Sequence, residues 1–153
     1  MKQNTDYGQS KIVPLFGDRG LPGNHRVLIV DDQPAYRNIM RNMLTGDRGF
    51  EIIGEAEDGG SAVERAAVLE PDVIVMDMQM PDMNGIEAAR RILSEKPEVR
   101  IVLTSMGDDA EYAPLSKEIG ACGFVTKRQL HASTVHALVD GRTPPADTEA
   151  LAA

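Results

Sequence analysis

Cysteine is nearly absent from this sequence, with Cys122 the only one among 153 residues. A lone cysteine cannot form a disulfide within the chain, which suits a reducing compartment. Long hydrophobic runs are also missing. No stretch reaches the roughly 18 apolar residues of a transmembrane helix, and the N-terminus lacks the apolar run and cleavage site of a signal peptide. We therefore expect a soluble, cytoplasmic protein with no membrane partner.

Positive charge is scarce as well. The chain has 16 Lys and Arg residues against 24 Asp and Glu residues, a formal net charge of -8. Nucleic acids and anionic membranes attract proteins through clustered Lys and Arg, and the sequence has no such cluster. The composition thus argues against direct binding of nucleic acid.

What the sequence does have is an alternation of short apolar runs with helical periodicity. Residues 1–24 and 142–153 lack a sustained period and are predicted to be flexible tails around one domain, residues 25–141. The predicted strands are residues 27–30, 51–56, 73–76, 100–105 and 123–127. Such alternation is typical of repeated β-α units and predicts an α/β fold with a doubly wound, five-stranded parallel sheet.

Start and stop signals place the first three helices. Pro34 suits the first helical position and Gly46 ends the first helix. Ser61 followed by Glu64 matches a capping box and predicts the start of the second helix. Asn84 can cap the third helix through its side-chain oxygen.

The last two helices have weaker signals. Pro114 is tolerated only in a first turn, so the fourth helix should begin between residues 109 and 113. The fifth helix is predicted for residues 128–140, with Gly141 as its stop.

Chemically active side chains stand where the predicted strands end. Asp31 and Asp32 follow the first strand, Asp77 follows the third, and the fourth and fifth end on Thr104 and Lys127. In an open α/β sheet, these strand ends meet at one rim. Carboxylate oxygens are ligands that suit Mg²⁺, which together with Lys127 would offset the repulsion between the acids. The pattern predicts a magnesium site.

Each of these residues taken singly has a more ordinary interpretation. An aspartate at a strand end commonly caps the next helix, a terminal lysine is usually solvated, and threonine favours strands. Their joint placement at one rim favours the functional interpretation. The neighbouring methionines are predicted to be adaptable packing, because soft thioethers do not suit a site of hard oxygen ligands. They are Met76, Met78, Met80, Met83 and Met106.

Four motifs in a fixed order, VDD, MDMQMPDMNG, LTS and GFVTK, resemble the receiver domain of two-component response regulators. The resemblance covers residues 26 to about 140 and is greatest to receivers of the NarL/LuxR type. It implies a flavodoxin-like, CheY-like (βα)5 fold. One departure is Arg128, since receivers often have proline after their lysine.

The resemblance also implies a role for each site residue. Phosphoryl transfer from a sensor histidine kinase or a histidine phosphotransfer protein, with Mg²⁺ as cofactor, would switch a partner-binding surface. The chain would be a phosphoacceptor that assists its own phosphorylation and dephosphorylation, not an enzyme. The implied roles are Asp77 as phosphoacceptor, Asp32 as direct metal ligand, Asp31 as ligand through water, the backbone carbonyl of Gln79 as third ligand, Thr104 as switch hydroxyl, Lys127 as phosphate-pairing amine and Phe124 as switch aromatic.

Three alternatives remain open. The chain could be a receiver fragment of a DNA-binding transcription regulator, although nothing after Gly141 is long or basic enough to supply that module. It could be a phosphohydrolase with an aspartyl nucleophile, but such enzymes have D-x-D, whereas Met78 and Gln79 follow Asp77. It could also be a protein-binding platform that never takes phosphate, which the intact residue set disfavours.

Overall fold

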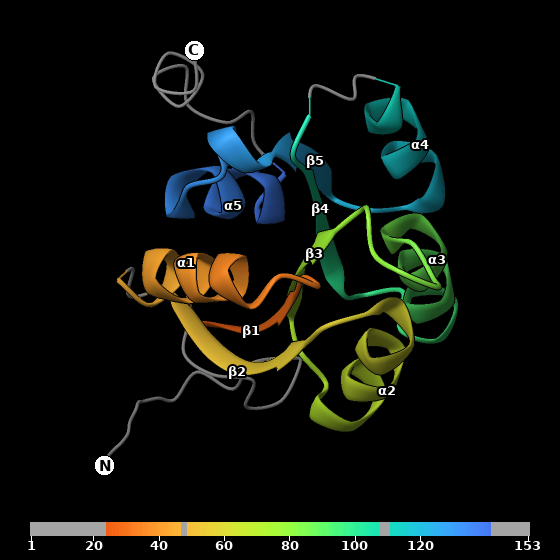
Figure 1. The fold of residues 1–153 in the computed structure, drawn as a ribbon, viewed down its shortest axis with the longest axis horizontal. Coiled ribbons are helices and arrows are strands. Elements are labelled where there is room, and N and C mark those ends of the chain that lie inside the picture. The colour runs from red at the N-terminus through yellow and green to blue at the C-terminus, as the bar shows by residue number, and fades with distance from the viewer. Residues whose placement is uncertain (1–23, 47–48, 108–110, 142–153) are drawn as a thin grey trace, which may run out of the picture.

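The computed structural model describes residues 24–46, 49–107 and 111–141 (Figure 1). The predicted tails lie outside the described residues apart from Asn24. The strands are β1 (His25–Val30), β2 (Phe50–Ala56), β3 (Val73–Asp77), β4 (Arg100–Ser105) and β5 (Gly123–Thr126). The helices are α1 (Pro34–Thr45), α2 (Gly59–Leu69), α3 (Gly85–Glu95), α4 (Tyr112–Ile119), the 3₁₀ turn η1 (Lys127–Gln129) and α5 (Ala132–Val139). None of the helices in these ranges is long and apolar enough to cross a membrane.

The five strands form one parallel sheet in the order β2-β1-β3-β4-β5. Helices α1 and α5 cover one face, and α2, α3 and α4 cover the other (Figure 1). The predicted doubly wound α/β sheet is therefore confirmed. Strand order reverses between β1 and β3, and the loops that leave these two strands diverge to opposite faces, which is where sites form in such sheets.

The central strands are buried on both faces, and this explains their continuous apolar runs. In β1, Val27 and Ile29 pack with α1 and α5, whereas Leu28 and Val30 belong to the cluster under the other three helices. All four side chains are fully buried. A strand covered on both faces does not need to alternate apolar and polar residues, so these continuous apolar runs correctly predicted strands.

Two helix starts differ from the prediction. Asp58, not Ser61, is the N-cap of α2, and its carboxylate accepts the Ser61 N–H at 2.7 Å. The Ser61 hydroxyl in turn accepts a hydrogen bond from the Asp58 backbone N–H at 3.4 Å, which makes Ser61 the third residue of the helix. Helix α5 begins at Ala132 rather than Arg128, because Thr126 caps the separate turn η1. The starts of α1, α3 and α4 agree with the prediction.

Gly85 fixes how closely α3 approaches the end of β3. Its N–H donates to the Met78 carbonyl at 2.8 Å. A Cβ at this position would lie 2.4 Å from the Asp77 carbonyl oxygen and 2.8 Å from the Met78 Cα. Since these atoms are backbone, a side chain here must displace the strand end that carries Asp77.

We predict that Gly85→Ala lowers the free energy of unfolding by about 2 kcal/mol or more, because overpacking against backbone cannot be relieved by a rotamer change. Chemical denaturation measures this. Gly60→Ala is the matched control, since a Cβ there would meet only Asp58 Oδ1 at 3.7 Å. Equal stability of the two variants would contradict the close approach at Gly85.

Candidate functional site

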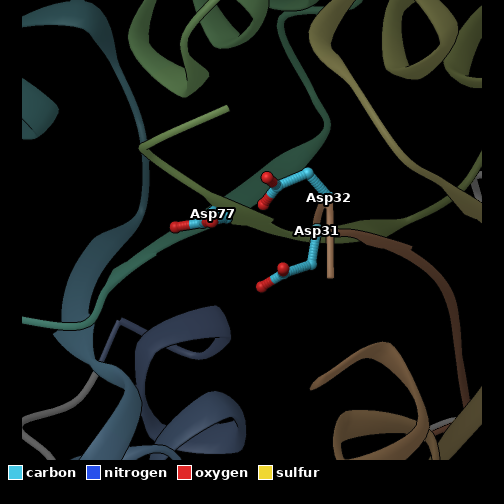
Figure 2. Close-up of side chains that lie close together, drawn as sticks. All are labelled: Asp31, Asp32 and Asp77. Atoms are coloured by element: carbon cyan, nitrogen blue, oxygen red, sulfur yellow. The ribbon is translucent and has the colours of Figure 1, made fainter. Parts of the chain in front are cut away.

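Three carboxylates from two adjacent strand ends point into one space (Figure 2). Asp31 and Asp32 follow β1, Asp77 ends β3, and one oxygen from each lies within 4.8 Å of the others. Asp31 is fully buried and Asp77 is 4% exposed, while Asp32 is more open to solvent. The structure thus brings together the three acids that the sequence predicted at one rim.

The loop after β1 is held by its own backbone and by α1. Asp31 Oδ1 accepts the Gln33 N–H at 2.9 Å, and the Asp31 N–H donates to the Ala56 carbonyl at 3.1 Å. Arg37 of α1 donates one guanidinium N–H to the Asp31 carbonyl and another to Glu55 of β2, the latter at 2.9 Å. These contacts fix the direction in which the first acid points.

Lys127 supplies positive charge to the acids. Its Nζ lies 2.7 Å from Asp31 Oδ2 and 3.5 Å from Asp77 Oδ2, and its side chain is 4% exposed. A buried ammonium and carboxylate need each other, because either one left unpaired in the interior costs several kcal/mol. The peptide bond between Lys127 and Arg128 is trans, as are the other described peptide bonds.

The charges at the rim do not balance. Burial raises the pKa of Asp77 above its ordinary value, Lys127 partly opposes this, and Asp31 adds to it. Three acids share one ammonium, so ionised aspartates leave an excess of two negative charges. Oxygen donors at this spacing with this excess fit a divalent cation, and a hard ion such as Mg²⁺ matches a site made of carboxylates.

Thr104 and Phe124 lie near the acids but in different environments. Thr104 pairs with Asp77 in the register of β3 and β4, and it is fully buried. Its Oγ1 has no hydrogen-bond partner among the described residues. Phe124 is half-buried in β5, with its ring centroid 6.4 Å from that of Tyr112. The hydroxyl is thus at the site, and the aromatic ring is in the layer beneath α4.

Gln79 lies beside Asp77, and the methionines near the site differ in burial. The Gln79 N–H donates to Asp77 Oδ1 at 3.3 Å, and its side chain is exposed. Met78 is buried, as expected of packing, but Met106 is 65% exposed, so its assignment as packing was wrong. An open depression of about 460 Å³ borders Asp32 on this side and is lined by Asp32, Met78, Gln79, Met80, Pro81, Asn84, Ile86 and Tyr112.

Tyr36 is a site residue that sequence reasoning missed. Its hydroxyl donates to the Lys127 carbonyl at 3.1 Å, and Lys127 Nζ lies 4.2 Å from its ring centroid. Burial, reinforced by Asp31 and Asp77, raises the pKa of Tyr36 to about 12, so the phenol keeps its proton. Its apolar position on the first helix was the only signal, and this does not distinguish a core residue from one that contacts the site.

A family model described as the response regulator receiver domain matches residues 27–139. The chain belongs to this family. Receiver domains bind Mg²⁺ at an acidic pocket and take phosphate from histidine kinases or phosphotransfer proteins, which agrees with the acid cluster of this chain.

Individual relatives support the same assignment. The transcriptional regulatory protein DegU of Brevibacillus brevis is 35% identical over 102 residues, which cover 67% of this chain but only 43% of DegU. A LuxR-family response regulator from Aurantimonas has a solved structure with a TM-score of 0.74 and 31% identity, covering 84% of this chain and 95% of that one. The CheX-CheY-BeF3-Mg complex from Borrelia burgdorferi includes a chain with a TM-score of 0.66 and 28% identity, covering 74% and 85%.

We predict that Asp77→Asn melts higher than wild type in chelator at pH 7, by roughly 4 °C if about 1 kcal/mol of repulsion is removed. The folded-state pKa of Asp77 lies above the ordinary 3.8, so ionisation of this group opposes folding. That penalty is absent below pH 3.8 and grows as pH rises through the folded-state pKa. The difference between the two melting temperatures should therefore shrink on acidification.

Asp32→Asn tests the metal site with the same melts, recorded with chelator and with Mg²⁺ at equal ionic strength. Wild type should gain about 1.4 kcal/mol at Mg²⁺ ten times its dissociation constant. Asp32→Asn should melt higher than wild type in chelator and gain much less from Mg²⁺. A lower melting temperature in chelator together with an unchanged Mg²⁺ shift would make Asp32 a cap or a surface charge.

Proposed function

We propose that this receiver domain is a phosphorylation-dependent switch in which Asp77 accepts the phosphoryl group. The observation that carries the proposal is the position of the buried Asp77 carboxylate. It lies 3.5 Å from Lys127 Nζ and opposite Thr104 of β4, whose hydroxyl has no hydrogen-bond partner among the described residues. Asp31, Asp32, Asp77 and the backbone carbonyl of Gln79 would hold Mg²⁺. When bound, the ion offsets the charge of the phosphoryl oxygens and keeps the reacting groups in line.

The reaction requires a carboxylate that is ionised and fixed in direction. In the proposed step, an Asp77 oxygen forms a bond to phosphorus while the bond from phosphorus to the donor breaks, and the donor, such as a histidine imidazole, leaves with the electron pair. The product is an acyl phosphate. Lys127, already held between Asp31 and Asp77, pairs with a phosphoryl oxygen and limits the repulsion between the two reacting anions.

The switch follows from what the product adds to the rim. An acyl phosphate brings acceptor oxygens, and the Thr104 hydroxyl lacks a partner in this structure. A hydrogen bond from Thr104 to the phosphoryl group would draw the segment after β4 toward Asp77. Phe124 would then change its position beneath α4, where it already lies beside Tyr112. The surface around α4 would be the part that reports phosphorylation.

The phosphoryl donor would be a sensor histidine kinase or a histidine phosphotransfer protein in the cytoplasm, acting on a chain with no enzymatic activity beyond its own phosphorylation and dephosphorylation. The BeF3 and Mg named for the similar Borrelia complex support a phosphoryl site and a magnesium site. A second candidate is the receiver part of a DNA-binding transcription regulator. The likeness to DegU, a transcriptional regulatory protein of which the chain spans less than half, favours this candidate.

We predict that the wild-type chain gains one phosphoryl group from acetyl phosphate in the presence of Mg²⁺ and none in chelator, because Asp77 needs its charge offset before it can attack an anion. Intact mass spectrometry measures the gain. Asp77→Asn should gain none under either condition. Asp82→Asn is the matched control, since Asp82 is an exposed acid on the same loop and should leave labelling unchanged. Labelling of Asp77→Asn would disprove the assignment.

Met106 generates a prediction about reversal. It lies two residues after Thr104 and is exposed. By the resemblance to receivers this position flanks the phosphoryl group, so a bulky apolar side chain here would obstruct water that approaches the acyl phosphate. Met106→Ala should speed decay of the phosphorylated form roughly threefold, equivalent to about 0.7 kcal/mol in the barrier. Val68→Ala, which shortens an exposed side chain on α2, is the control. An unchanged decay rate for Met106→Ala would remove Met106 from the path of water.

A further inference from the structure

Lys127 has a long side chain that must be held at one point. Four rotatable bonds separate its ammonium from the backbone, and fixing them costs conformational entropy. The turn η1, capped by Thr126 and Gln129, fixes the backbone on one side. The carboxylates attract the ammonium, but they are also the groups that the reaction needs to leave available.

Tyr36 contacts Lys127 at both ends. Its hydroxyl donates to the Lys127 carbonyl at 3.1 Å, which ties the start of η1 to α1. Its ring faces the ammonium, with Nζ 4.2 Å from the centroid, while the same Nζ lies 2.7 Å from Asp31 Oδ2. A ring face attracts a cation without supplying a competing carboxylate. This holds the ammonium at the site without adding negative charge to the rim.

We propose that Tyr36 is a positioning residue for phosphoryl transfer, acting through Lys127. The inference rests on the proposed roles of Asp77 and Lys127 in that reaction. The hydroxyl fixes where the lysine backbone enters the site, and the ring fixes where the ammonium ends. In this role Tyr36 acts through Lys127 and not on the reacting atoms, so its loss should change the orientation of Lys127 and not the nucleophile Asp77.

Two substitutions separate the ring from the hydroxyl. Tyr36→Phe keeps the ring under the ammonium, and Tyr36→Leu removes both contacts. A cation–π contact is worth between about a twofold and a thirtyfold change in rate, with the larger values at desolvated sites, and a tenfold change lies within this range. We expect Tyr36→Leu to take phosphoryl groups from acetyl phosphate about tenfold more slowly than wild type. Tyr36→Phe, which keeps the ring, should retain most of the wild-type rate. A small donor is used because α1 could also contact a protein donor.

A control must separate positioning from a general loss of packing. Met43 lies two turns further along α1 and packs in the same core cluster as Tyr36. Met43→Ala, compared at matched stability by thermal melting, should leave the rate close to wild type. In a Lys127→Ala background, Tyr36→Leu should cause no further slowing, because the residue through which it acts is gone. A slowing that persists without Lys127 would overturn the proposal.

Nuclear magnetic resonance gives a readout that is independent of the reaction. Protons on the Lys127 ε-carbon should be shifted upfield by the ring in wild type and Tyr36→Phe, and should return to ordinary values in Tyr36→Leu. An ordinary chemical shift for these protons in wild type, or a wild-type phosphorylation rate in Tyr36→Leu, would reject the proposed role of Tyr36 and leave the proposed function standing. Failure of the wild-type chain to take any phosphoryl group would instead reject the proposed function, so the two failures are distinguishable.

Discussion

The Lys127 ammonium lies between Asp31 and Asp77, 2.7 Å and 3.5 Å from their Oδ2 atoms, and the chemistry of the rim depends on this buried charge. One cation cannot balance three carboxylates, so the site has an electrostatic deficit that a divalent ion matches. Without Lys127 the interior would hold uncompensated carboxylates, at a cost of several kcal/mol. With a second fixed cation the acids would be satisfied, and the affinity for metal would fall. Partial neutralisation of the carboxylates by Lys127 therefore stabilises the fold and still allows the site to bind a divalent cation.

The topology of the sheet explains why these residue types occupy these positions. Pairing of β1 with β3 sets their terminal acids side by side, and the register of β3 with β4 sets Thr104 beside Asp77. Lys127 follows β5, two strand spacings from β3, a distance of about 10 Å. Only a long side chain spans that distance, which is a geometric reason for lysine there. Tyr36 contacts the same lysine from α1, so the sheet and the helix layer that covers it both help to hold one ammonium group.

Sequence patterns were informative wherever a residue's role follows from its place along one strand. The buried runs identified the sheet, and the strand ends identified the acids. The α2 start was wrong because Asp58 and Ser61 both fit an N-cap, and only their mutual hydrogen bonds distinguish them. The α5 start was wrong because Thr126 caps a local turn that interrupts the helical pattern. Tyr36 was missed and Met106 was wrongly assigned as packing, because burial and contacts between elements depend on how α1 and the β4 end pack against the rest of the domain.

In the proposed mechanism, the site is incomplete in two complementary ways. It lacks positive charge, which a metal ion would supply, and the Thr104 hydroxyl has no acceptor among the described residues, which a phosphoryl group would supply. A ligand shifts a conformational equilibrium only through contacts that differ between the two states. A hydrogen bond to a charged oxygen contributes about 1.5 to 3 kcal/mol, which shifts a population ratio by roughly 10- to 150-fold. In this mechanism one buried hydroxyl would be sufficient to turn phosphorylation of Asp77 into a change at α4 when the two states of the segment after β4 lie within that range of free energy.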